Sequence, residues 1–288
     1  MTERRGPIHG IFGRPHADLS FLVDDATLDA IDEEIGLGLV HAEATYTGGT
    51  LKWMGVVAPW VTDDGYEDAM VVIRRLSPSD YETFLSLSDP PCEPERCPQA
   101  STVFGDETDR PFSRAQLDWL TMRHGAYFPW KVCVHLLAND RWEDKHLGAG
   151  KSFDAEAERL FPKTVALIRR LPFLEVGRVV IFGVAANDHA PLHRDSEPGR
   201  ALGVAQSITL APGRKKRFFL CNHEDDEPLV VAPRVYWFND MDYHGVLPDP
   251  YFRYSIRIDG VFDPTFLREL EDRLRGRGPR SPRSTPAR

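Results

Sequence analysis

Val179-Val180-Ile181-Phe182-Gly183-Val184 is a nearly continuous apolar run of strand length, and it opens the part of the chain that decides the fold. Further strand candidates follow it at 206–210, 217–221, 229–231, 235–238 and 254–258. Turn sequences such as Ala211-Pro212-Gly213 separate these candidates, and no helix is expected between them. Consecutive short strands of this kind are typical of an antiparallel sandwich or barrel, so we expect a jelly-roll-like β domain.

Helices are expected mainly before that domain. Capping residues and apolar spacing predict helices at 25–36, 78–87, 116–124 and 155–171, and Asp263-Pro264 predicts a last helix at 265–274. Prolines and charged residues predict a long loop at 88–110. We therefore predict the α+β class, mainly β, in three parts. A helical and mixed region at 1–172 supports the core and the substrate pocket, the core with the last helix spans 173–274, and a disordered basic tail occupies 275–288.

The composition is that of a globular protein, because 42% of the 288 residues are hydrophobic and 27% are charged. No stretch approaches the roughly 18 consecutive apolar residues that a membrane span requires. Residues 1–7 lack the apolar stretch of a signal peptide. We therefore expect a cytoplasmic protein that does not enter a membrane.

Charge and cysteine content narrow the expected partners further. Six arginines and no acid lie between Arg273 and Arg288, and removing their charge from the net −9 leaves a body at −15. A body this acidic repels phosphate backbones, so we expect no nucleic acid partner. Four cysteines are too few for a disulfide framework, and Cys92 and Cys97 lack the second ligand pair of a zinc site. We expect reduced cysteines in a reducing compartment.

Metal-ligand chemistry is concentrated after the 179–184 run, in the segment that ends with His193-Arg194-Asp195. On extended chain, His193 and Asp195 point to the same side. An imidazole nitrogen and a carboxylate oxygen aimed at one point form two-thirds of a facial triad, which binds non-haem Fe(II) and leaves positions open for a co-substrate and dioxygen. A second imidazole follows at His244, 49 residues after Asp195. This gap is long enough for several strands to bring the chain back.

The last predicted strand carries polar side chains on one face, because Arg253, Ser255 and Arg257 alternate along it. An inward-facing arginine needs an anionic partner, since an unpaired buried guanidinium is costly. The distal carboxylate of a dicarboxylate suits a guanidinium with a neighbouring hydroxyl.

His193-x-Asp195, His244 and Arg253-x-Ser255, in this order and spacing, resemble the Fe(II)/2-oxoglutarate-dependent dioxygenases, whose core is a double-stranded β-helix of the jelly-roll or cupin-like type. The stretch 178–263 also resembles the aspartyl/asparaginyl β-hydroxylase-like branch, although mammalian-type members of that branch lack a carboxylate ligand at the position of Asp195. The resemblance implies that His193, Asp195 and His244 hold Fe(II). It also implies that Arg253, helped by Ser255, holds the distal carboxylate of 2-oxoglutarate.

This resemblance implies that dioxygen and 2-oxoglutarate hydroxylate a C–H bond of an amino acid, a peptide-linked residue or a small metabolite, with release of succinate and CO2. Desaturation or ring closure would use the same ligands. Two other function classes stay open: a cupin-type metal enzyme that does not use 2-oxoglutarate, and a non-catalytic β domain that binds a ligand.

Some residue roles also stay open. Arg257 lies about 13 Å along the strand from Arg253, at about 3.3 Å per residue, so the two cannot hold one carboxylate. It could meet the other end of the co-substrate, a substrate anion or the internal acid Asp259. His223 and Asp225 form a rival ligand pair in a polar run that we expect to be an exposed turn. His189, four residues before His193, could contact the metal ligands or the substrate.

Overall fold

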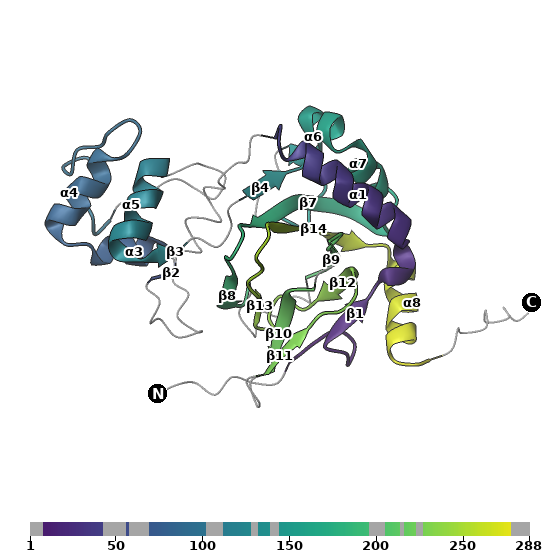
Figure 1. Cartoon of the computed structure of the whole chain (residues 1–288). Coiled ribbons are helices and arrows are strands. Elements are labelled where there is room, and N and C mark those ends of the chain that lie inside the picture. Colours follow the sequence, from purple (N-terminus) through teal and green to yellow (C-terminus); the bar gives the residue numbers. More distant parts are fainter. Residues whose placement is uncertain are drawn as a thin grey trace, which may run out of the picture.

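The computed structural model describes residues 8–42, 56–57, 69–101, 112–127, 132–138, 144–195, 205–213, 216–222 and 227–277. Two larger antiparallel sheets, a layer of helices and a smaller helical cluster make up this part of the chain (Figure 1). The predicted combination of helices with antiparallel sheets is therefore confirmed.

The two larger sheets differ in size. The six-stranded sheet has the order β1-β12-β9-β14-β7-β4, with the bounds β1 His16–Asp18, β12 Val235–Phe238, β9 Ser207–Leu210, β14 Arg253–Phe262, β7 Phe173–Val184 and β4 Val132–His135. The four-stranded sheet has the order β11-β10-β13-β8, with the bounds β11 Glu227–Val230, β10 Phe218–Asn222, β13 His244–Val246 and β8 Ala190–His193. Two short pairs join β2 (Val56–Val57) to β3 (Ala126–Tyr127) and β5 (Leu137–Ala138) to β6 (Ser152–Phe153). Strands on both sides of residue 172 thus belong to the six-stranded sheet.

Alternation along β7 and β14 gives the six-stranded sheet two unlike faces. The two strands pair from Arg253 opposite Val184 to Phe262 opposite Phe173. Successive side chains point to opposite faces of a strand. The outer face is apolar and buried, with Val179, Ile181, Ile256 and Ile258 in the main hydrophobic cluster. The inner face carries Ser255, Arg257 and Asp259, and the first two line a cavity together with Phe218 and His244 of the four-stranded sheet.

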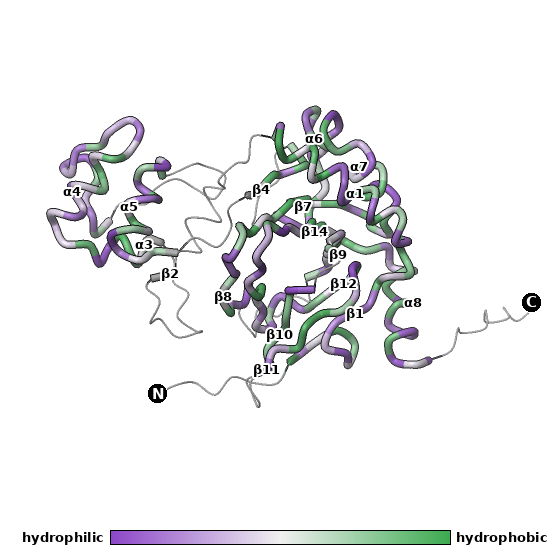
Figure 2. The backbone as a smooth tube through the Cα atoms, in the orientation of Figure 1, coloured by the Kyte–Doolittle hydropathy of each residue, from purple (hydrophilic) through white to green (hydrophobic). Residues whose placement is uncertain are grey.

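Helices cover the apolar outer face. They are α1 (Asp25–Gly38), α6 (Ala155–Leu160), α7 (Pro162–Ile168) and α8 (Pro264–Leu274), and a 3-10 turn at Ser20–Leu22 precedes α1. Figure 1 shows α1, α6 and α7 along β7 and β14, and Figure 2 shows hydrophilic and hydrophobic residues alternating along these helices. Leu28, Ile31, Phe161 and Leu270 from the helices share one hydrophobic cluster with the strand residues. Burial of these apolar faces therefore holds the helices on the sheet.

Local capping explains the helix starts. The Asp24 carboxylate accepts a hydrogen bond from the Thr27 N–H, and the predicted capping box at the start of α5 (Arg114–His124) is present between Ser113 and Gln116. The helices predicted at 25–36, 78–87, 116–124 and 265–274 are confirmed, and the structure starts the last two at Arg114 and Pro264.

The prediction of a single helix at 155–171 is wrong, because the structure has two helices, α6 and α7, with a break at Phe161. Phe161 has φ −129° and ψ 47°, outside the helical region. Proline disfavours a helical conformation in the residue before it and has no N–H to donate to the preceding turn. Pro162 therefore ends one helix and occupies the first turn of the next.

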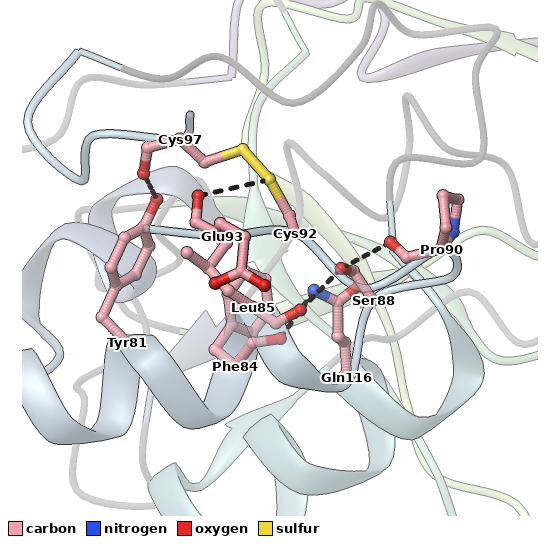
Figure 3. The surroundings of a disulfide bond; sticks show 9 residues. All are labelled: Tyr81, Phe84, Leu85, Ser88, Pro90, Cys92, Glu93, Cys97 and Gln116. Atoms are coloured by element: carbon pink, nitrogen blue, oxygen red, sulfur yellow. Dashed lines mark hydrogen bonds between the residues drawn. A yellow bond between two sulfur atoms is a disulfide. The ribbon is translucent and has the colours of Figure 1, made fainter. Parts of the chain in front are cut away.

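A second, smaller hydrophobic cluster holds α3 (Ala69–Arg75), α4 (Pro78–Ser86) and α5 together. The prediction of reduced cysteines is wrong here, because Cys92 and Cys97 form a disulfide beside α4 (Figure 3). The Cys97 N–H donates to the Glu93 carbonyl at 3.2 Å, and the Tyr81 hydroxyl donates to the Cys97 carbonyl at 2.6 Å. This turn brings two cysteines that are five residues apart into bonding range. Cys221 on β10 is buried.

Some predicted features lie wholly or partly beyond the described ranges. The predicted loop at 88–110 is described only as far as residue 101, and the predicted tail only as far as residue 277. In the described ranges, every helix is too short or too polar to cross a membrane.

Candidate metal centre

The end of β8 and the start of β13 bring two imidazoles together. These strands are antiparallel neighbours, and their register places His193 directly opposite His244. Directly opposed residues project to the same face of a sheet. The two ring centroids are 4.4 Å apart, and both side chains are buried.

Asp195 completes the group two residues after the end of β8. Its backbone N–H donates to the Asp240 carbonyl at 2.9 Å, which ties the segment after β8 to the segment before β13. Its Oδ1 atom lies 3.5 Å from Nε2 of His193 and 3.7 Å from Nε2 of His244. One donor atom from each of the three residues lies within 4.8 Å of the others, as ligands around one ion with bonds of about 2 Å require. The structure therefore brings His193, Asp195 and His244 to one point.

A hydrogen bond fixes the tautomer of His244. Its Nδ1 lies 2.8 Å from the Asp242 carbonyl oxygen, which can only accept, so Nδ1 carries the proton and the Nε2 lone pair faces Asp195. Burial, helped by the neighbouring His193, lowers the pKa of His244 to about 4. A neutral imidazole is the form that binds a metal.

The loop that carries this carbonyl is itself anchored. The Asp242 carboxylate accepts hydrogen bonds from the backbone N–H groups of His9 and Gly10, at 2.7 and 2.8 Å. The segment before β1 therefore holds the loop before β13 in place, and with it the hydrogen bond that orients His244.

The second oxygen of Asp195 is bound by an arginine. Arg257 Nη1 lies 2.5 Å from Asp195 Oδ2, and Arg257 Nε lies 3.1 Å from Asp259 Oδ1. Burial opposes the charge of Asp195, but Arg257 and the two imidazoles hold the pKa of its carboxyl well below the usual range. Asp195 is therefore an anion with one oxygen toward the imidazoles and the other on a guanidinium.

This ion pair continues into the interior. Asp259 also contacts Arg178, with Oδ2 at 2.8 Å from Nε and 2.7 Å from Nη2. Beside the chain of charges, Lys145 Nζ lies 3.1 Å from Asp240 Oδ2. The buried charges thus alternate in sign, as the cost of burying an unpaired ion demands.

The triad lines a small cavity that adjoins a larger one. A small cavity of about 60 Å³ contains His193, Asp195 and His244 in its wall, together with four aromatic residues and three polar ones: Phe182, Phe218, Tyr236, Phe238, Thr209, Ser255 and Arg257. A larger cavity of about 250 Å³ shares Phe182, Phe218, Tyr236, Val246 and Ser255 with it. The larger one is also lined by cationic side chains from Lys216, Arg217 and Arg253. Both cavities lie against the inner face of the six-stranded sheet.

The remaining predicted residues fall into place around these cavities. Ser255 borders both of them, and Arg253 borders the larger one, where its Nη2 also donates to the Asp188 carbonyl at 2.9 Å. Of the three partners considered for Arg257, the structure shows the internal acid Asp259. Arg257 also contacts Asp195, which was not among those three partners.

The two weaker ligand candidates are not part of this centre. The rival His223 and Asp225 lie outside the described residues. His189 is exposed, and the metal-ligand group that the described residues form does not include it.

Several residues of the site were missed by sequence reasoning. Arg178, Thr209, Tyr236 and Asp240 carry no motif, and each reaches the site through strand pairing or a loop contact. The signal available for Arg178 and Thr209 was a polar residue inside an otherwise apolar strand, since a buried polar side chain needs a partner.

Comparison with known proteins gives matches among solved structures alone. No protein-family model matches the sequence, and no curated protein sequence does. An oxidoreductase of the 2OG-Fe(II) oxygenase family from Burkholderia pseudomallei is 17% identical, with a TM-score of 0.28, over 51% of this chain and 78% of that one. A prolyl-4-hydroxylase from Pseudomonas putida is 11% identical, with a TM-score of 0.27, over 44% of this chain and 70% of that one. The viral collagen prolyl hydroxylase vCPH from Paramecium Bursaria Chlorella virus-1 is 9% identical, with a TM-score of 0.27, over 38% of this chain and 77% of that one. The solved structures to which this chain is similar thus include one described as a 2OG-Fe(II) oxygenase and two described as prolyl hydroxylases.

Proposed function

We propose that this protein is an Fe(II)- and 2-oxoglutarate-dependent oxygenase that hydroxylates a C–H bond of an amino acid, a peptide-linked residue or another small metabolite. The observation that carries the proposal is the position of three donor atoms, two imidazole nitrogens and one carboxylate oxygen, within 4.8 Å of one another. Two imidazoles and one carboxylate fit Fe(II) and leave positions free for other ligands. When bound, Fe(II) with 2-oxoglutarate and dioxygen supplies the oxidising power, and the co-substrate leaves as succinate and CO2.

The strand order supports a double-stranded β-helix as the scaffold. From β7 to β14 the described residues form eight strands. Strands β7, β9, β12 and β14 belong to the larger sheet, and β8, β10, β11 and β13 form the smaller one. Repeated crossing between two facing antiparallel sheets is the arrangement of a jelly roll. We further propose that region 1–172 supports this core, because β1 and β4 extend its larger sheet on both edges.

The chain's own residues would each contribute a defined part of the chemistry. His193, Asp195 and His244 would hold the metal, and the Arg257 contact leaves Asp195 Oδ1 as the oxygen that faces the imidazoles. Arg253 and Ser255 line the cavity next to the triad and would hold the distal carboxylate of 2-oxoglutarate. Phe182, Phe218 and Phe238 form an apolar wall that limits the access of water to the reacting groups.

Anaerobic metal binding followed by turnover tests the proposal. The purified chain should bind one equivalent of Fe(II), consume 2-oxoglutarate in air and form succinate, with stoichiometric succinate once a substrate is supplied. His193→Ala and His244→Ala should abolish both metal binding and succinate formation. His189→Ala is the matched control, because this exposed histidine lies on the same connection and outside the triad. Metal binding without succinate formation, or equal loss in the control, would contradict the proposal.

Arg253 can be tested separately. Arg253→Ala should mainly raise the apparent KM for 2-oxoglutarate, because the carboxylate would lose a charged hydrogen-bond donor. An unchanged KM would assign the distal carboxylate to another residue.

A further inference from the structure

Two buried hydrogen-bond donors face the triad cavity without a hydrogen-bond partner among the described residues. The hydroxyl of Thr209, a residue that is 4% exposed, is one of them, and Arg257 Nη2 is the other. Asp240 Oδ2 lies 3.9 Å from Arg257 Nη2, beyond hydrogen-bond distance. A buried polar group without a partner is costly, so these two donors call for an acceptor.

Strand pairing places the two donors side by side. Thr209 on β9 is directly opposite Arg257 on β14, and Thr209 is also opposite Tyr236 on β12. Directly opposed side chains stand about 5 Å apart on one face of a sheet. Thr209 and Arg257 both line the small cavity that contains the triad. Their donors therefore point toward a common acceptor in that cavity.

The chemistry of the pair specifies a carboxylate. A guanidinium N–H and a hydroxyl both donate, and a carboxylate accepts from both in a charge-assisted arrangement. The position specifies which carboxylate, because Nη1 of the same guanidinium contacts the metal-ligand candidate Asp195 at 2.5 Å. A group bound at Nη2 is therefore close to the metal position. Arg253 lies about 13 Å further along the strand and serves the opposite end.

We propose that Thr209 and Arg257 recognise the carboxylate of 2-oxoglutarate that lies beside its keto group, the end that approaches the metal. In this arrangement Arg257 binds two carboxylates. Its Nη1 binds Asp195, and its Nη2, together with the Thr209 hydroxyl, binds 2-oxoglutarate. This inference rests on the proposed function, and it assigns to Thr209 a role that no sequence motif indicates.

Thr209→Val is the test variant, because valine keeps the shape of threonine and removes only the hydroxyl. Substitution of Arg257 is less suitable, since it would leave Asp195 and Asp259 without their shared cation. Ser207→Ala is the matched control: Ser207 lies on the same strand and face, is also buried without a hydrogen-bond partner among the described residues, and does not line either cavity.

The dissociation constants of two ligands are measured by calorimetry on the Mn(II)-loaded protein without oxygen. The ligands are 2-oxoglutarate and 2-oxopentanoate, which has the same chain with a methyl group in place of the distal carboxylate. Thr209→Val should weaken both ligands about tenfold, the effect of losing one hydrogen bond to a charged group. Ser207→Ala should leave both unchanged, and Arg253→Met should weaken only 2-oxoglutarate.

The outcomes separate this inference from the proposed function. If Thr209→Val weakens only 2-oxoglutarate, Thr209 serves the distal carboxylate and the inference is overturned. If it changes neither ligand, the hydroxyl does not contact the ligand and the inference is overturned as well. In both cases the wild-type affinity for 2-oxoglutarate leaves the proposed function standing. A wild-type protein that binds Mn(II) but neither ligand would overturn the proposed function and this inference together.

Discussion

Replacement of Arg178 by methionine should be among the most damaging single changes to the stability of the β core. Arg178 and Asp259 are both 0% exposed, and their closest contact is 2.7 Å. At that distance the attraction is on the order of 6 kcal/mol for an effective dielectric constant of about 20. Methionine carries no charge, so the variant does not have the free-energy cost of burying a guanidinium, and this offsets part of the loss. Removing one partner of a buried pair therefore costs about 3–5 kcal/mol, because the other charge stays buried with less compensation.

Urea unfolding followed by tryptophan fluorescence measures this loss, since Trp237 is buried in the core that covers the same sheet. Arg159→Met is the control: it makes the same substitution in an exposed pair, with Arg159 65% and Glu156 51% exposed, and should cost less than about 1 kcal/mol. Adding Asp259→Asn to Arg178→Met should recover part of the loss, because the uncompensated carboxylate is then gone. An Arg178→Met variant no less stable than the Arg159→Met control would refute the reasoning.

Three further changes test other parts of the structure. Gly245→Ala should weaken Mn(II) binding at least about tenfold, because a Cβ atom there would lie 2.9 Å from the Ala190 carbonyl between β13 and β8. The control variant His189→Ala should bind Mn(II) as the wild type does. In metal-free protein, the free energy of unfolding should fall by up to about 3 kcal/mol as the pH is lowered from 6.5 to 4, because His244 takes up a proton in the unfolded chain but not in the folded one. Denaturation curves of His244→Gln should show a weaker dependence of this free energy on pH. Reduction of the Cys92–Cys97 disulfide should destabilise the α3–α5 cluster by about 2 kcal/mol, from the loss of a short loop constraint, and hydrogen exchange of α4 should report it while β7 stays protected.

The elements that the sequence predicted well are those with local causes. The capping box at Ser113 and Gln116 depends on residues three apart, and it is present. The apolar run at 179–184 lies inside β7, since a buried strand reveals itself by its own residues. The break at Phe161 also has a local cause, Pro162, but the regular apolar spacing on both sides obscured it.

The candidate site was predictable only in part. His193 and Asp195 are two residues apart, so extended backbone alone places them on one side, and the return of His244 could be expected from the number of strands between them. The partners of Arg257 could not be chosen in the same way, because Asp259 was one of several anions within reach and Asp195 is 62 residues away. The Cys92–Cys97 disulfide depends on a turn whose hydrogen bonds the residue spacing does not specify.

The amino-acid sequence by itself determined the capped helices, the long apolar strand and which side chains share a strand face, because these properties depend on neighbours within a few residues. Only the tertiary structure decided that His193 stands opposite His244 and that Thr209 stands opposite Arg257. Register between strands is chosen by the burial of whole faces and by the pairing of charges across them, and no single segment contains that information. The metal centre and the two donors beside it are therefore products of strand pairing.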